Sequence, residues 1–105
     1  MNFSNLFLAL SLLIPGHNFA MVSPETQFQQ AVNEIFDIAE SIQVQSNNDS
    51  LTKGTYASTR KNFVKYYNEI MILMNANPIL HNQIHYKWIE QIQNLNAAIK
   101  NCEPS

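Results

Sequence analysis

The sequence is poor in cysteine, glycine and charge. Cys102 is the only cysteine, so no disulfide can form within one chain and packing has to stabilise the fold. Gly16 and Gly54 are the only glycines, which argues against a glycine-rich phosphate-binding loop. Charged residues make up 13% of the chain, against about 25% in typical domains. Uncharged groups therefore supply much of the polar surface, and the chain holds 22 Asn and Gln residues.

Long hydrophobic runs are also missing. The stretch LFLALSLLI, at positions 6–14, is apolar except for one serine, and Pro15-Gly16 follows it. A membrane-spanning helix needs about 20 apolar residues, whereas the core of a secretory signal has about 7 to 15 and precedes a small residue at the cleavage point. Ala20 is a small residue in that place. The sequence therefore predicts a cleaved signal peptide over 1–20, and no stable membrane insertion after its removal.

Two features fit a signal peptide poorly. The first five residues, MNFSN, contain no Lys or Arg, and Asn18 departs from the usual A-x-A pattern before the cut. The alternatives are an apolar helix packed on the domain, and translation from Met21. The leading prediction is a secreted or periplasmic protein whose mature form is a single domain over 21–105.

Apolar periodicity predicts three helices, over about 24–45, 54–75 and 78–102. Ser23 and Pro24 form a helix start, because serine caps exposed N–H groups and proline fits the first turn. The first helix has one apolar face at spacings of three and four residues: Phe28, Ala31, Val32, Ile35, Ala39 and Ile42.

The second helix has an unusually wide apolar arc, and the third has one apolar face. Residues 46–50, SNNDS, favour a turn, after which Thr52 or Thr55 caps the second helix. Asn77 and Pro78 are the expected start of the third. The second helix carries one line of Tyr56, Phe63, Tyr67, Ile70 and Met74 and another of Ala57, Val64 and Met71; the third carries Leu80, Ile84, Trp88, Leu95, Ile99 and Cys102. Short connections between long amphipathic helices predict an all-α, up-down-up three-helix bundle, in which Trp88 is largely buried.

Charge differs between the first two helices. The first has four acidic residues and no basic one, and Glu34, Asp37 and Glu40 among them are expected to lie on a solvated face away from the apolar stripe. The second has an excess of basic residues. This contrast favours packing of the two helices side by side, while the acidic pI of 5.8 argues against nucleic acid as a partner.

The strongest chemical motif is HNQIH at 81–85. Two histidines four residues apart on a helix place both imidazoles on one side, as in zinc sites, but Asn82 stands where the hydrolytic motif needs Glu. A catalytic zinc also needs a third protein ligand, and His17 is lost with the signal peptide. We therefore expect His81 and His85 to lie at the edge of the core, with metal binding as the alternative.

No arrangement of residues predicts catalysis. The chain has no Cys-x-x-Cys pair and no haem-attachment motif, and no Ser or Thr stands beside an evident base. We expect a protein that is not an enzyme and that needs no cofactor. Asn48 begins an N-x-S sequon, which is a glycosylation site only if the host is a eukaryote. Cys102 is interpreted as a small apolar residue of the last helical turn, with an intermolecular disulfide as the alternative.

The function suggested by these features is non-catalytic protein binding, as an inhibitor, effector or assembly partner. The second helix has more apolar surface than a three-helix core needs, and Val64, Met71 and Ile72 are the candidate binding residues. The alternative for Val64 and Met71 is that the second helix is central in the bundle and that neighbouring helices cover these two residues on both sides. Binding another protein or a second copy is the expected role; the alternative is a carrier of a small molecule, in the interior between the second and third helices, or of a metal at His81 and His85.

Overall fold

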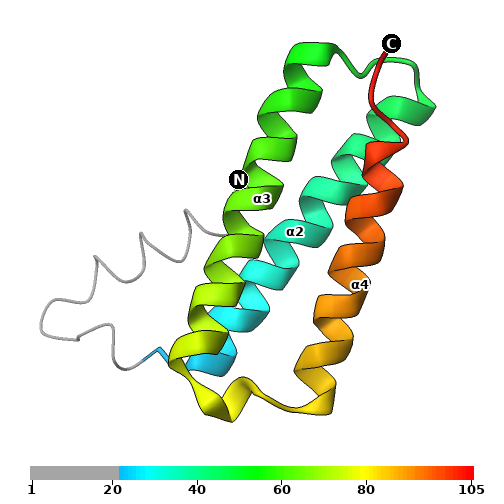
Figure 1. Cartoon of the computed structure of the whole chain (residues 1–105). Helices are drawn as coiled ribbons and strands as arrows, with labels where there is room; N and C mark the ends of the chain where they lie inside the picture. Colours follow the sequence, from blue (N-terminus) through cyan, green and yellow to red (C-terminus); the bar gives the residue numbers. More distant parts are fainter. Residues whose placement is uncertain (1–21) are drawn as a thin grey trace, which may run out of the picture.

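The computed structural model describes residues 22–105, which form three α-helices, one short 3₁₀ helix and no strand. The helices are α2 (Pro24–Asn47), α3 (Lys53–Ala76) and α4 (Gln83–Lys100), and the 3₁₀ helix is η2 (Pro78–Leu80). Consecutive α-helices run in opposite directions, and α2 lies between α3 and α4 in the view of Figure 1. The all-helical prediction is confirmed. The predicted signal peptide over 1–20 and the mature start at Met21 lie outside the described residues.

Helix α2 begins where the sequence predicts. The Ser23 hydroxyl oxygen accepts a hydrogen bond from the Thr26 backbone N–H at 3.1 Å, and Pro24 occupies the first turn. The helix continues to Asn47, slightly further than predicted, and Asp49 then turns the chain with a left-handed φ of 56°. The buried apolar face matches the prediction at Phe28, Val32, Ile35, Ala39 and Ile42.

Helix α3 is capped by Thr52 rather than Thr55. The Thr52 side-chain oxygen accepts from the Thr55 backbone N–H at 3.1 Å. Tyr66 is buried, whereas Tyr67, which the sequence places in the core line, is only partly buried. Tyr67 is drawn toward α4, because its hydroxyl accepts a hydrogen bond from Gln93 at 3.3 Å. The buried residues of α3 are Tyr56, Phe63, Tyr66, Ile70 and Met74.

The predicted third helix over 78–102 is wrong in its first part. Only Pro78–Leu80 is helical there, as η2, and α4 begins at Gln83. Asn82 is the N-cap, since its Oδ1 accepts from the His85 backbone N–H at 3.1 Å. The predicted cap, Asn77, makes no side-chain cap to η2.

The role of Asn77 explains this difference. Its side-chain amide donates to the Leu73 carbonyl at 2.8 Å and so satisfies a free carbonyl at the end of α3. The Asn77 side chain is therefore bonded to the end of α3, while Asn82 caps the start of α4. Both asparagines are acceptable caps by residue type, and the packing of the connection selects between them.

The buried face of α4 is rotated from the predicted one. His85, Ile92 and Ile99 are buried at seven-residue spacing, whereas the predicted Ile84 is 67% exposed. Ile84 is wrong as a core residue because successive helical residues point about 100° apart, so the burial of His85 turns Ile84 to solvent. The predicted residues Leu95 and Cys102 are partly buried beside the core, and Leu80 and Ile99 are fully buried.

Trp88 is partly buried rather than largely buried. Its ring packs edge to face against Phe36 of α2, with centroids 5.7 Å apart and planes at 80°. Both residues lie against the edge of the buried core rather than in it. Trp88 therefore ties α4 to α2 while part of its surface stays in water.

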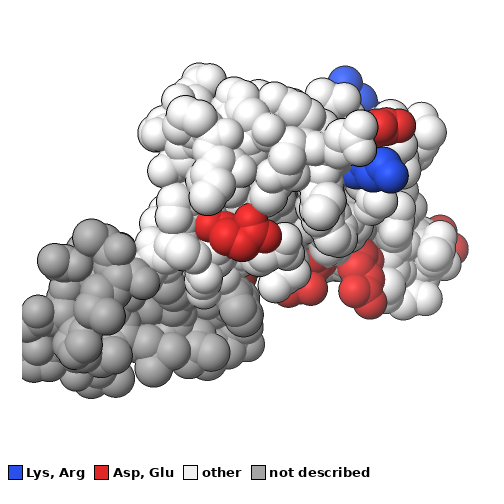
Figure 2. Space-filling model, turned by 90° about the horizontal axis from the view of Figure 1, so that it is seen from below, with Lys and Arg blue, Asp and Glu red and all other residues white. Residues whose placement is uncertain are grey.

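The end of the molecule at the α3–α4 connection is largely uncharged. Figure 2 views this end and shows mostly side chains other than Lys, Arg, Asp and Glu on the described surface. Ile79, in η2, is 76% exposed, and Ile84, in the first turn of α4, is 67% exposed. Exposed apolar residues of this kind are common singly on soluble proteins. Among residues 22–105, no helix is long and apolar enough to span a membrane.

Candidate functional site: a groove between helices α3 and α4

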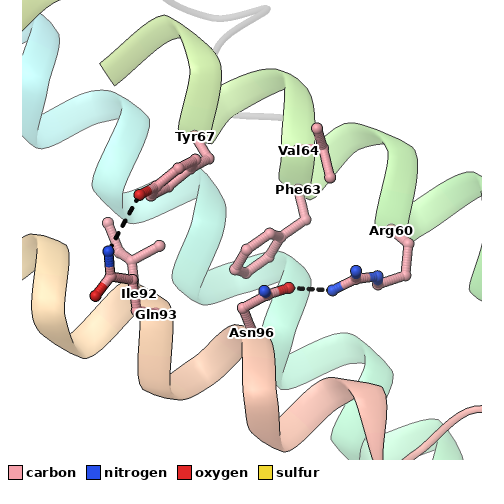
Figure 3. A pocket seen from close by; sticks show the side chains of 7 residues that line it. All are labelled: Arg60, Phe63, Val64, Tyr67, Ile92, Gln93 and Asn96. Atoms are coloured by element: carbon pink, nitrogen blue, oxygen red, sulfur yellow. Dashed lines mark hydrogen bonds between the residues drawn. The ribbon is translucent and has the colours of Figure 1, made fainter. Parts of the chain in front are cut away.

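Helices α3 and α4 leave an open groove between them. Helix α2 makes extensive contacts with both, whereas α3 and α4 contact each other little. The groove encloses a hollow of about 160 Å³, which we call the α3/α4 groove. Figure 3 shows the side chains that line it: Arg60, Phe63, Val64 and Tyr67 from α3, and Ile92, Gln93 and Asn96 from α4.

The floor of the α3/α4 groove is apolar and rigidly held. Phe63 is 2% exposed and Ile92 is fully buried, so both belong to the core that lies beneath the hollow. Val64, in contrast, is 45% exposed at the border of the hollow. A floor fixed by core packing offers apolar contact without having to reorganise when something binds.

Polar side chains cross the groove at two places. The Arg60 guanidinium donates to Asn96 Oδ1, and Gln93 Nε2 donates to the Tyr67 hydroxyl at 3.3 Å (Figure 3). Among residues 22–105, Arg60 is the one charged residue that lines the hollow. The arrangement, an apolar floor with a few polar groups at its edge, is typical of a binding site.

The three predicted binding residues occupy different parts of α3. Val64 lines the α3/α4 groove, and Met71, two turns later on nearly the same line, is 37% exposed. Ile72 is 68% exposed and points elsewhere, into a second hollow between α2 and α3. That α2/α3 hollow, of about 330 Å³, is lined by Gln27, Ala31, Glu69, Ile72, Leu73 and Ala76. The candidate residues therefore belong to two surfaces rather than one.

The two histidines of HNQIH are not on one helical face. His81 precedes α4, where its Nε2 bonds the Met74 carbonyl at 2.8 Å. Since a carbonyl only accepts, Nε2 carries the proton, and Nδ1 accepts from the Tyr86 hydroxyl at 3.1 Å. Both ring nitrogens are thus occupied in the described structure.

His85 is buried and engaged on both sides. Its Nδ1 lies 2.7 Å from Asn82 Oδ1, and its Nε2 pairs with Glu25 of α2. Asn82 Oδ1 also accepts from the His85 N–H, and the Asn82 amide nitrogen donates to a carbonyl, so this oxygen must be an acceptor and Nδ1 carries a proton. The ring also packs edge to face on Phe28, with centroids 4.6 Å apart. His85 therefore joins α4 to the start of α2.

Sequence reasoning missed the pair between His85 and Glu25. The two residues are far apart in the sequence, and only the antiparallel return of α4 brings them together. The expectation for Glu34 is also wrong, because it is 3% exposed instead of lying on a solvated face. Asp37 and Glu40 are exposed as expected. Glu34 lies on the side of α2 near Ala31 and Ile38, which are partly buried against the core.

The remaining candidate residues lie at the opposite end. Asn48 follows α2 as its C-cap and is exposed in the turn, where a glycan would meet no obstruction from the core. Cys102 follows α4, is partly buried, and directs its thiol to the Ala98 carbonyl at 3.7 Å. Within residues 22–105, no cluster of three or more His, Cys, Asp or Glu residues is placed to hold a metal ion.

Comparison with known proteins gives no relatives from which a function follows: no family model matches, and no curated protein or solved structure is significantly similar.

Proposed function

We propose that this is a small exported helical protein that acts by non-catalytic protein binding, as an inhibitor, effector or assembly partner. The observation that supports it is the α3/α4 groove, a preformed apolar hollow bordered by Val64 and open to solvent. An apolar hollow with a few polar groups at its edge is the usual form of a binding site. Met71 continues the same surface along α3.

The size of the hollow favours a partner protein over a carried small molecule. Pockets for drug-sized ligands enclose about 300 to 1,000 Å³, whereas this one encloses about 160 Å³. An engineered cavity of about 150 Å³ holds benzene. One apolar side chain of a partner therefore fills the α3/α4 groove. In the metal-carrier alternative, His81 and His85 would first have to give up their present hydrogen-bond partners.

Export of the protein is part of the proposal and rests on the sequence of 1–20. Expression in a secreting host should yield a mature chain that begins at Met21, because LFLALSLLI, Pro15-Gly16 and Ala20 have the layout of a removable signal. The intact mass of the exported product measures this directly. A full-length mass, or retention in the cytosol, would contradict it.

Binding is tested by introducing a charge at the groove. Val64→Lys places an ammonium group at the apolar border, while Ser58→Lys places the same group on an exposed part of α3 that does not line it. We expect Val64→Lys, but not Ser58→Lys, to abolish capture of the partner from the secretions of the native host and any self-association in sedimentation. Ile72→Lys tests the α2/α3 hollow in the same assays. If Val64→Lys and Ser58→Lys behave alike, the groove is not the binding surface.

A further inference from the structure

Three basic residues lie on the lines of α3 and α4 that face the α3/α4 groove, and of these three Arg60 lines the hollow itself. On α3, Lys53 and Arg60 are seven residues apart and fall on the line that continues to Val64 and Tyr67. On α4, Lys100 follows Asn96 by one turn on the lining face. These three basic residues lie toward the start of α3 and the end of α4, and at that end Asp49 and Glu103 line a separate hollow with the residues that follow α4.

The acidic residues of these two helices lie elsewhere. Glu69 lines the α2/α3 hollow instead. Glu90, at 100° per residue, falls on a line of α4 further from α3 than Gln93 and Asn96 do. Neither carboxylate is placed to neutralise Arg60.

Arg60 itself lacks a carboxylate partner within the described residues. The ion pair found among residues 22–105 joins His85 and Glu25, while Arg60 donates to the neutral amide oxygen of Asn96. A guanidinium has five N–H donors in a planar fork that matches a carboxylate. One neutral acceptor leaves most of these donors to water, so a carboxylate arriving in the groove gains charge-assisted hydrogen bonds.

Helix α2 is an example of a helix that packs against both α3 and α4. It carries four acidic residues and no basic one, and it packs its apolar face against both helices from the side opposite the groove. An amphipathic helix with an acidic polar face thus already packs against this pair within the chain, and its Glu25 pairs with His85 of α4. A similar helix from a partner could pack between α3 and α4 on the side away from α2, and the four helices would then form a bundle.

We infer that the α3/α4 groove binds an acidic amphipathic helix of a partner protein. One apolar side chain of that helix fills the hollow over Phe63 and Ile92, and a carboxylate one turn away pairs with Arg60. Lys53 and Lys100 extend the attraction along the groove. This inference rests on the proposed protein-binding function and specifies the chemistry of the partner.

The probes are two synthetic helical peptides with one apolar face in common. The polar face of one carries Glu, and that of the other carries Lys at the same positions. Binding to the protein as exported is followed by fluorescence anisotropy of the labelled peptides, at low and at physiological salt. The variants are Arg60→Gln, Val64→Lys and, as a matched control, Lys61→Gln, which removes the adjacent exposed cation that does not line the groove. Circular dichroism checks that each variant is folded.

The expected result is saturable binding of the Glu peptide and little binding of the Lys peptide. Arg60→Gln should weaken the Glu peptide about tenfold, because a charge-assisted hydrogen bond is lost, and should reduce the dependence on salt. Lys61→Gln should leave the affinity within about twofold. Val64→Lys should remove binding through its steric and desolvation cost in the apolar hollow.

Three results would overturn the inference, and they separate it from the proposed function. If the Lys peptide binds as tightly as the Glu peptide and Val64→Lys abolishes both, the groove binds helices but does not select acidic ones. If sedimentation shows a dimer that Val64→Lys dissociates, the occupant is a second copy. If neither peptide binds, or if Arg60→Gln and Val64→Lys leave binding unchanged, both the inference and the groove as a protein-binding site fail.

Discussion

Replacement of His85 by alanine removes a contact that joins the beginning of α4 to the beginning of α2. The ring is lost from its edge-to-face packing on Phe28, at 4.6 Å, and from its hydrogen bond to Asn82, at 2.7 Å. Glu25 also loses this partner and keeps the hydrogen bond that it accepts from Gln29. Asn82 still caps α4 in the variant, because its Oδ1 accepts from the backbone N–H of residue 85.

The magnitude follows from how well each lost contact is shielded from water. An aromatic pair is worth about 0.5 to 1.5 kcal/mol beyond the area it buries, and a net hydrogen bond about 0.5 to 1.5 kcal/mol. The side chain of Glu25 is 54% exposed, so the freed carboxylate returns to water and the ion pair contributes only about 0 to 1 kcal/mol. These contributions add to about 1 to 4 kcal/mol, so we expect His85→Ala to lower the free energy of unfolding by about 2 to 3 kcal/mol, the middle of that range, and Glu25→Gln by less than about 1 kcal/mol.

Thermal unfolding followed by far-UV circular dichroism separates these two values. In a domain of this size each kcal/mol shifts Tm by about 4 to 8 °C, so His85→Ala should lower Tm by at least about 8 °C. Glu40→Gln removes an exposed carboxylate from the same helix and controls for the change in net charge. If Glu25→Gln destabilises the protein as much as His85→Ala does, the ion pair and not the ring packing holds the helices together. Wild-type stability of His85→Ala would refute the burial of this ring.

Further expectations concern the register and ends of α4. Ile92→Ala should cost about 2 to 5 kcal/mol in urea unfolding, since Ile92 is fully buried, while Ile84→Ala should stay within about 0.5 kcal/mol. A larger cost for Ile84→Ala than for Ile92→Ala would place the buried face where the sequence alone puts it. Trp88→Ala should cost about 2 to 3 kcal/mol, less than a fully buried tryptophan, because part of the ring is in water; a loss near 5 kcal/mol would show that it is a core residue. Asn82→Ala should lower Tm by at least about 4 to 8 °C, because it removes an N-cap worth about 1 kcal/mol together with the hydrogen bond to the His85 ring. An unchanged Tm would show that Asn82 does not cap α4.

Helix α2 could be predicted almost completely from the sequence. Its cap, its proline and its apolar stripe are all local signals, and they agree with one another: Ser23 bonds the turn that follows it, and Phe28 through Ile42 recur at helical spacing. For the start of α3 the sequence allowed two caps, Thr52 and Thr55. Thr52 is the cap, and its side-chain oxygen accepts a hydrogen bond from the Thr55 backbone N–H.

The start of α4 could not be predicted in the same way. Asn77 and Asn82 are equivalent as caps by residue type, and Ile84 and His85 are neighbours of which only one can face α2. By hydrophobicity Ile84 is the better core residue. His85 is buried in its place because Phe28 and Glu25, at the other end of the sequence, give its ring an apolar contact and a hydrogen-bond partner.

The candidate site was also predictable from the sequence only in part. The sequence identified Val64 and Met71 as apolar residues beyond those a small core requires, and Val64 does border a hollow. It could not show that Ile72 belongs to another surface, or that Arg60, Gln93 and Asn96 lie opposite one another across the groove. Those relations depend on the distance between α3 and α4, which neither helix specifies alone.

The sequence by itself determined that residues 22–105 form amphipathic helices with short connections, because caps, turns and helical periodicity involve residues within a few positions of each other. Only the tertiary structure decided which face of α4 is buried, that Glu34 lies inside, and that a groove remains between α3 and α4. The physical reason is that α2 is shared by both neighbours. Each of them packs against α2 rather than against the other, so the open groove and the contacts of His85 arise from three helices together and are encoded in no single one.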